Sequence, residues 1–188
     1  MSKKEILQAF LIGADKETEW MIDWFITTYR NCGNMQKFVF ADFGLSPDGR
    51  KYVENHPMII GVMEMENKQP KAWFLKPEAM FFAPVRKCIW LDMDMEFNSG
   101  VVGFIGKPRI LREWALKTAN KNHLEVGDQE VLHSMLNPIT QLTYIHELPN
   151  EYNVLRLQVE LDNYKGPKKI IHWTGAKGKE RIKEIMNA

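Results

Sequence analysis

Two aspartates separated by one residue are the strongest chemical signal in the sequence. Asp92 and Asp94 follow the apolar run 87–91, which is typical of a buried strand. Side chains two apart on a strand share a face, so both carboxylates can point to one site. Two buried carboxylates repel each other, and a hard divalent cation with oxygen ligands removes that cost. Taken alone, however, an Asp-x-Asp triplet is more often an exposed turn.

Two polar motifs downstream could bind a sugar. The run Asn98-Ser99-Gly100 offers side chains that hydrogen-bond hydroxyls and a glycine that lets the backbone approach a ligand closely. Asp128 and Gln129 open a predicted helix. Each motif has a simpler interpretation, a β-bulge or turn for the first and a helix N-cap for the second. Neither predicts a ligand site by itself.

A histidine late in the chain adds a possible metal ligand. His172 ends the apolar run 169–172, and a glycine-rich stretch with Lys177 and Lys179 follows it. Imidazole binds metal ions, while lysines and backbone amides suit a diphosphate. A surface histidine beside a solvated basic segment is the alternative.

The elements that must position these motifs alternate between strand and helix. We expect strands at residues 8–13, 37–42, 58–65, 87–91, 142–145 and 169–172, and an extended glycine-rich segment at 98–104. We expect helices at about 18–31 with Asp15 as N-cap, from residue 46 onward, and at 77–82, 108–120 and 128–136. This alternation predicts an α/β fold with a mostly parallel sheet covered by helices on both faces. Ligands of such sheets bind beyond the C-terminal ends of the strands.

Composition narrows the class of protein. The 188 residues are 45% hydrophobic and 26% charged, as in a folded domain of one core. The net charge of +1 lacks the basic excess of nucleic-acid-binding proteins. No apolar run reaches the roughly 20 residues of a transmembrane helix. Two cysteines without a CxxC pair argue against structural zinc and favour a reducing, cytoplasmic location.

In their order along the chain, these motifs resemble those of the GT-A glycosyltransferases, specifically glycosyltransferase family 8 and its relatives. The matching residues are Ala14 and Asp15 after the first strand, Asp92 and Asp94, Asn98-Ser99-Gly100, Asp128 and Gln129, and His172 with Gly175. The resemblance implies a single Rossmann-like GT-A domain, with a nucleotide-binding part at about 1–95 and a sugar and acceptor part at about 96–188. It also implies a nucleotide-diphospho-sugar donor, UDP-linked by default, a Mn²⁺ or Mg²⁺ ion, and transfer with retention to an unknown glycan, lipid or small-molecule acceptor.

The same resemblance assigns roles to individual residues. Asp92, Asp94 and His172 would hold the metal. Ala14, Asp15 and Trp20 would lie at the nucleotide, with Trp20 as a possible stacking partner of the base. Asn98, Ser99, Asp128 and Gln129 would line the transferred sugar, with Asp128 and Gln129 as candidate catalytic residues. Gly175 with Lys177 or Lys179 would contact the diphosphate. Lys76 would take the place of the basic residue that many relatives carry before the Asp-x-Asp strand. For Lys76 an exposed lysine is an equal alternative.

Two departures from the family pattern stand out. The family's terminal lysine falls at residue 178, which is glycine here. Relatives also place a few dozen residues between Asp-x-Asp and Asn-Ser-Gly, where this chain has only residues 95–97. Three residues span about 10 Å, which leaves little room for a strand to leave the sheet and return. A family segment is therefore missing here, either deleted naturally or omitted from the chain.

Two other functions remain open. A non-catalytic nucleotide-sugar-binding protein could keep the fold without turnover. A nucleotidyltransferase also uses acidic pairs on an α/β sheet, but would release pyrophosphate from a nucleoside triphosphate. The histidine after a late strand and the Asn-Ser-Gly run favour glycosyl transfer.

Overall fold

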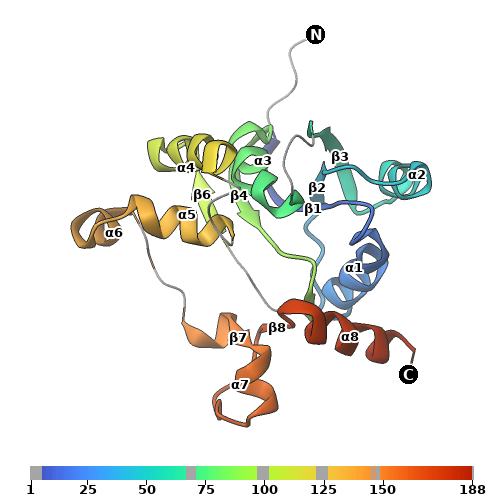
Figure 1. Ribbon diagram of the computed structural model, residues 1–188. Helices are drawn as coiled ribbons and strands as arrows, with labels where there is room; N and C mark the ends of the chain where they lie inside the picture. The colour runs from blue at the N-terminus through green and yellow to red at the C-terminus, as the bar shows by residue number, and fades with distance from the viewer. Residues whose placement is uncertain are drawn as a thin grey trace.

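A five-stranded sheet forms the centre of the protein (Figure 1). The computed structural model describes residues 6–66, 71–96, 102–121, 127–144, 146 and 149–187. The strand order is β3-β2-β1-β4-β6. These strands are β1 (Ile6–Ala14), β2 (Phe38–Asp42), β3 (Ile59–Glu64), β4 (Val85–Trp90) and β6 (Val102–Ile105). The first four run parallel and β6 runs antiparallel to β4, which confirms the predicted mostly parallel sheet.

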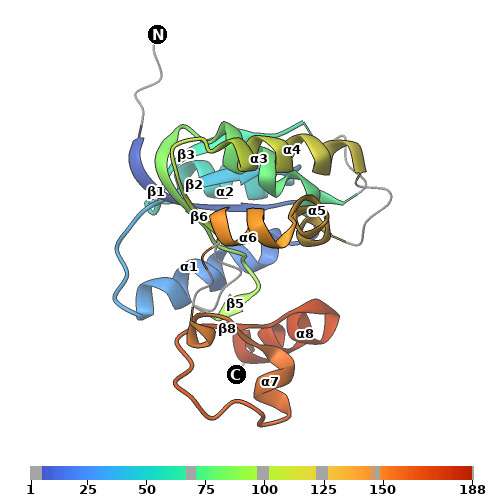
Figure 2. The ribbon, with the colours of Figure 1, turned by 90° about the vertical axis from the view of Figure 1, so that its left-hand side faces the viewer.

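Helices cover both faces of this sheet, also as predicted. On one face, α1 (Ile22–Asn31) and α8 (Gly175–Met186) contribute to a core with Phe25, Tyr29 and Phe38 at its centre. On the other face, η2 (Ala72–Leu75), α3 (Lys76–Phe82) and α4 (Arg109–Lys121) surround Phe74 and Trp114. Figure 2 shows α3 and α4 on one side of the sheet and α1 on the other. Two apolar cores therefore hold the sheet between two layers of helices.

The first helices differ in how their N-terminal ends are capped. In α2 (Pro47–Asn55), the Ser46 hydroxyl accepts a hydrogen bond from the Gly49 amide and proline occupies the first turn. The predicted helix at 18–31 is divided into η1 (Glu19–Met21) and α1. Asp15 does not cap α1; its carboxylate accepts hydrogen bonds from the amide and hydroxyl of Thr18 in the preceding turn.

A smaller sheet lies beside the C-terminal helix. It has the order β5-β8-β7, with β5 (Met95–Glu96), β7 (Val154–Leu155) and β8 (Ile171–His172). β5 and β8 are antiparallel, and Met95 is the partner of His172. The short helices η3 (Asn150–Tyr152) and α7 (Arg156–Glu160) flank β7 and were not predicted.

The chain leaves the large sheet after Trp90 and is back at Val102, which pairs with Trp90 across the β4–β6 ladder. Of the short interval between Asp94 and Asn98, Met95 and Glu96 form β5. Residues 97–101 lie outside the described part of the chain, and the short interval stays consistent with a missing family segment.

Two sequence predictions fail in the second half. Residues 142–145 were expected to form a strand, but residues 142–144 belong to α6 (Pro138–Tyr144), and residue 145 lies outside the described residues. The helix predicted at 128–136 does end before Asn137, but Asn137 then accepts hydrogen bonds from the amides of Ile139 and Thr140 and so starts a new helix. The cap of α5 (Asp128–Met135) is Gly127, and Asp128 is already helical.

Among the described residues, no helix combines the length and the apolar character needed to cross a bilayer.

Candidate active site

Acidic residues gather at the C-terminal edge of the parallel strands. β4 ends at Trp90, and Asp92 and Asp94 follow it. Asp42 ends β2, and Asp15 follows β1. This is the edge at which parallel α/β sheets bind ligands.

Lys76 joins two of the predicted site residues in a buried charge cluster. Lys76 opens α3 and is 7% exposed, while Asp128 opens α5 and is 5% exposed. The Lys76 ammonium lies 3.0 Å from Asp92 Oδ1 and 3.6 Å from Asp128 Oδ2. Lys76 is thus not an exposed lysine; it links the Asp-x-Asp segment to the start of α5.

The cluster shifts the pKa of each member. Burial opposes the charge of Lys76, but Asp92 and Asp128 outweigh it and raise the pKa of the ammonium. Burial also opposes ionisation of Asp92, yet Lys76, His172 and the Trp90 indole together lower its pKa. For Asp128 burial dominates over Lys76, so its pKa is raised. Two nearby carboxylates therefore differ, with Asp92 more acidic and Asp128 less acidic than a free aspartate.

Asp94 and His172 form a second pair beside the cluster. His172 Nε2 lies 3.3 Å from Asp94 Oδ1. The β5–β8 ladder holds the pair, and the Trp173 amide donates a hydrogen bond to the Asp94 carbonyl. The Trp173 indole also donates a hydrogen bond to Glu96. Burial lowers the pKa of His172, but the contact with Asp94 outweighs this and raises it.

The donor atoms of the Asp94–His172 pair, a carboxylate oxygen and an imidazole nitrogen, are types that bind divalent cations. The two atoms are 3.3 Å apart, the separation of a hydrogen-bonded ion pair, and neighbouring ligands of an octahedral ion would lie about 3.0 Å apart. Within the described part of the chain, no three His, Cys, Asp or Glu side chains form a complete ligand set. Asp92, the third predicted ligand, instead contacts Lys76 and Trp90. The pair would therefore supply two ligands and leave other positions for substrate oxygens and water.

The predicted nucleotide residues lie around the end of β1. Ala14 is buried and pairs with Asp42 of β2. Asp15 is half-buried and engaged with Thr18. Trp20 packs against the core, and the Lys183 ammonium lies 4.9 Å from its ring centre. The structure thus brings Ala14 and Asp15 to one edge, while the Trp20 ring contacts α8. Asn98 and Ser99 lie outside the described residues.

The start of α8 explains the glycine at position 178. Gly175 has a φ of 74°, which favours glycine. A Cβ on Gly178 would lie 1.9 Å from the Trp173 carbonyl oxygen, so a lysine cannot occupy this position without moving the helix. Lys177 is exposed and Lys179 half-exposed. Lys177 and Lys179, which flank Gly178, are therefore the candidates for a lysine contact to a phosphate in this segment.

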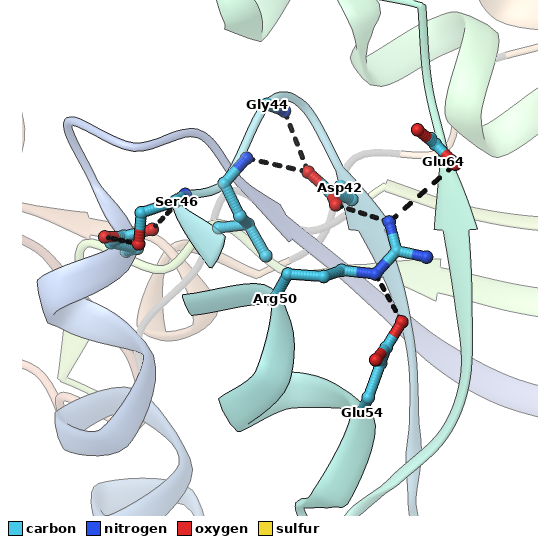
Figure 3. Close-up of polar contacts among 8 residues, drawn as sticks. Asp42, Gly44, Ser46, Arg50, Glu54 and Glu64 are labelled. Atoms are coloured by element: carbon cyan, nitrogen blue, oxygen red, sulfur yellow. Dashed lines mark hydrogen bonds and ion pairs between the residues drawn. The ribbon is translucent and has the colours of Figure 1, made fainter. Parts of the chain in front are cut away.

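A polar network that the sequence did not reveal braces the end of β2 (Figure 3). Asp42 accepts hydrogen bonds from the amides of Gly44 and Leu45, each at 2.8 Å, and from Arg50 at 2.7 Å. Arg50 also binds Glu54.

A second contact fixes the same loop. The Glu19 carboxylate accepts hydrogen bonds from the amide and hydroxyl of Ser46. The loop after β2 is thereby tied to η1, next to the predicted nucleotide site.

A cavity of about 1430 Å³ opens from the charge cluster along the sheet. Lys76, Asp92 and Asp128 line one part of it, together with Gln129. Ile89 is another lining residue. The cavity also extends past Gln8 of β1 and Lys87 of β4, so the charge cluster occupies one part of a long open space beside the sheet.

Comparison with known structures supports the fold. The chain superposes on the galactosyltransferase LgtC in complex with donor and acceptor sugar analogues with a TM-score of 0.64 and 12% identity, covering 96% of this chain and 95% of that one. The active-site mutant Q189E of LgtC gives a TM-score of 0.62 at 11% identity. The glycosyltransferase GlyE of Streptococcus pneumoniae TIGR4 gives 0.59 at 14% identity, covering 89% of this chain and 55% of GlyE.

No family model and no curated protein sequence matches the chain. At these identities the structural neighbours establish the fold alone. They confirm that the chain has the α/β fold of glycosyltransferases, as its resemblance to family 8 implied.

Proposed function

We propose that this protein is a metal-dependent glycosyltransferase that uses a nucleotide-diphospho-sugar, with UDP as the favoured nucleotide. The observation that carries this proposal is the meeting of Lys76, Asp92 and Asp128 beside the Asp94–His172 pair, at the edge where α/β sheets bind ligands. The fold shared with LgtC, which was crystallised with donor and acceptor sugar analogues, supports the substrate class.

Asp94 and His172 would hold a Mn²⁺ or Mg²⁺ ion, with Asp92 next to them. When bound, such an ion neutralises charge on the departing nucleoside diphosphate. Lys177 or Lys179, at the start of α8, would add positive charge on the same side. Asp92 is kept ionised by Lys76, so it can accept a hydrogen bond from the donor as well as face the ion.

Asp128 would bind the transferred sugar. Its Oδ2 is buried and lies 3.6 Å from the Lys76 ammonium, so an ion pair holds this oxygen in the free protein. The Asp128 side chain also lines the cavity, which supports a contact between Asp128 and a sugar hydroxyl there. Gln129, the next residue, is exposed towards the cavity, and Asn98 and Ser99 would complete the sugar side.

Retention with attack from the face of the leaving group is the stereochemical part of the proposal. The departing phosphate would take the proton of the acceptor hydroxyl, which belongs to a glycan, a lipid or a small molecule.

Binding and turnover test the proposal in sequence. Titration calorimetry of the protein with Mn²⁺ and UDP-sugars should detect binding, and Asp94→Asn and His172→Ala should lose the Mn²⁺ dependence. Asp48→Asn, an exposed carboxylate in the first turn of α2, is the matched control and should bind as the wild type does.

Donor hydrolysis or transfer should then be absent from both site variants and present in the control. Wild-type turnover in both site variants contradicts the metal role. Binding without turnover in the wild type indicates a nucleotide-sugar-binding protein, and release of pyrophosphate from a nucleoside triphosphate indicates a nucleotidyltransferase.

A further inference from the structure

We propose that Trp90 is a positioning residue that fixes the carboxylate of Asp92 through its indole N–H. The inference rests on the proposed function, because it concerns how one donor-site residue is oriented. Trp90 Nε1 donates a hydrogen bond of 2.7 Å to Asp92 Oδ1. Neither the motif pattern nor the resemblance gives Trp90 a role.

The indole is held in place on several sides. Trp90 is 3% exposed and ends β4, where it pairs with Leu11 of β1 and Val102 of β6. Its ring stacks on Phe43, with centroids 6.0 Å apart and planes at 17°. A hydrogen-bond donor on a side chain this confined has one available direction, which is towards Asp92.

The other donor to Asp92 is less restrictive. The Lys76 ammonium lies 3.0 Å from Oδ1 and donates to Oδ2 at 3.3 Å, and it is shared with Asp128 at 3.6 Å. Lys76 therefore supplies charge to both carboxylates, whereas the Trp90 indole donates its hydrogen bond to a single oxygen of Asp92. We assign the orientation of the Asp92 carboxylate to Trp90 and its neutralisation to Lys76.

A tryptophan is required for this role because phenylalanine would keep the apolar ring and lose the donor. Trp90→Phe is therefore the informative change. Trp24→Phe is the matched control, since Trp24 is 6% exposed and its Nε1 has no hydrogen-bond partner among the described residues. Both variants shrink a buried indole, but only the first removes a hydrogen bond.

Two measurements distinguish positioning from packing. In donor turnover, Trp90→Phe should lower kcat by roughly tenfold with little change in donor KM, since a hydrogen bond to a charged group is lost. Trp24→Phe should leave kcat unchanged. In ¹H–¹⁵N spectra of the metal-free protein, Asp92→Ala should shift the Trp90 indole resonance upfield and leave that of Trp24 in place.

The outcomes separate this inference from the proposed function. Absence of wild-type turnover with every nucleotide sugar overturns the proposed function. Wild-type turnover with an unchanged kcat in Trp90→Phe, or an indole resonance unaffected by Asp92→Ala, overturns the role of Trp90 alone.

Discussion

Replacing Lys76 with methionine removes the ammonium of the buried cluster while keeping a similar apolar stem. In the folded protein it leaves two carboxylates without their counter-charge, at side-chain exposures of 18% for Asp92 and 8% for Asp128. Breaking a buried ion pair from one side costs about 3–5 kcal/mol. Because domains are stable by only about 5–15 kcal/mol, the variant should be marginal but measurable.

The loss of stability in Lys76→Met should depend on pH, and the direction of this dependence follows from the pKa shifts. Lys76 lowers the pKa of Asp92 and offsets part of the rise at Asp128, so its removal raises the pKa of both folded carboxylates. A carboxyl whose folded pKa is raised opposes folding increasingly as pH rises through that pKa. The deficit in the free energy of unfolding of Lys76→Met should therefore be larger at pH 8 than at pH 5.

Urea unfolding of the wild type and the variant at both pH values measures this difference. Lys169→Met is the control, since Lys169 forms its pair with Glu151 at the exposed surface and should show little effect. The double variant Lys76→Met/Asp128→Asn removes one uncompensated charge and should recover about 1–3 kcal/mol. Equal deficits at pH 5 and pH 8, or no recovery in the double variant, would refute the reasoning.

Three further predictions concern single positions. Gly178→Ala should lower stability by about 1–3 kcal/mol in thermal unfolding because its Cβ would meet the Trp173 carbonyl at 1.9 Å; an unchanged Tm contradicts this close packing. Asp42→Asn should cost about 1–3 kcal/mol in urea unfolding, since an amide group would face Arg50 in place of a carboxylate oxygen; equal stability shows that the network is not stabilising. Asp128→Asn removes a carboxyl whose pKa is raised by burial, so its stability relative to the wild type should increase between pH 4 and pH 7, with donor turnover lost at both; a relative stability that falls over this range contradicts that shift.

The large sheet was predictable because its strands are continuous apolar runs. Residues such as Leu11, Val39 and Phe40 are buried whatever their position along the strand, which is the pattern of a parallel sheet covered on both faces. The helix at 109–121 was predictable from its spacing of apolar residues. Leu116 is an exception to this spacing, because it is apolar and yet 55% exposed.

The small sheet was only partly predictable. Strands of two residues, such as β5 and β7, are too short to show a period, and their pairing is decided by the tertiary fold. The error at 142–145 has a local cause. The predicted helix 128–136 ends as expected before Asn137 and Pro138, but an asparagine before a proline is also the signal for the start of another helix.

The site was predicted in its residue types more than in its contacts. The sequence pattern indicated Asp92, Asp94 and His172, and the structure places Asp94 against His172. It did not indicate that Lys76 would be buried against Asp128, because β4, β5, β6 and α4 separate them along the chain. Trp90 was missed for another reason: an apolar aromatic at the end of a strand gives no sign that its N–H will be used.

The contact between Asp94 and His172 joins residues far apart in the chain, and a ladder of two residues supports it. So short a ladder can fray while Trp173 and Ile182 keep α8 in the core that it shares with α1. A ligand that bridges Asp94 and His172 binds only the arrangement in which the two side chains meet, and it adds its binding free energy to that arrangement alone. The pairing of β5 with β8 would then become firmer as the concentration of substrate rises.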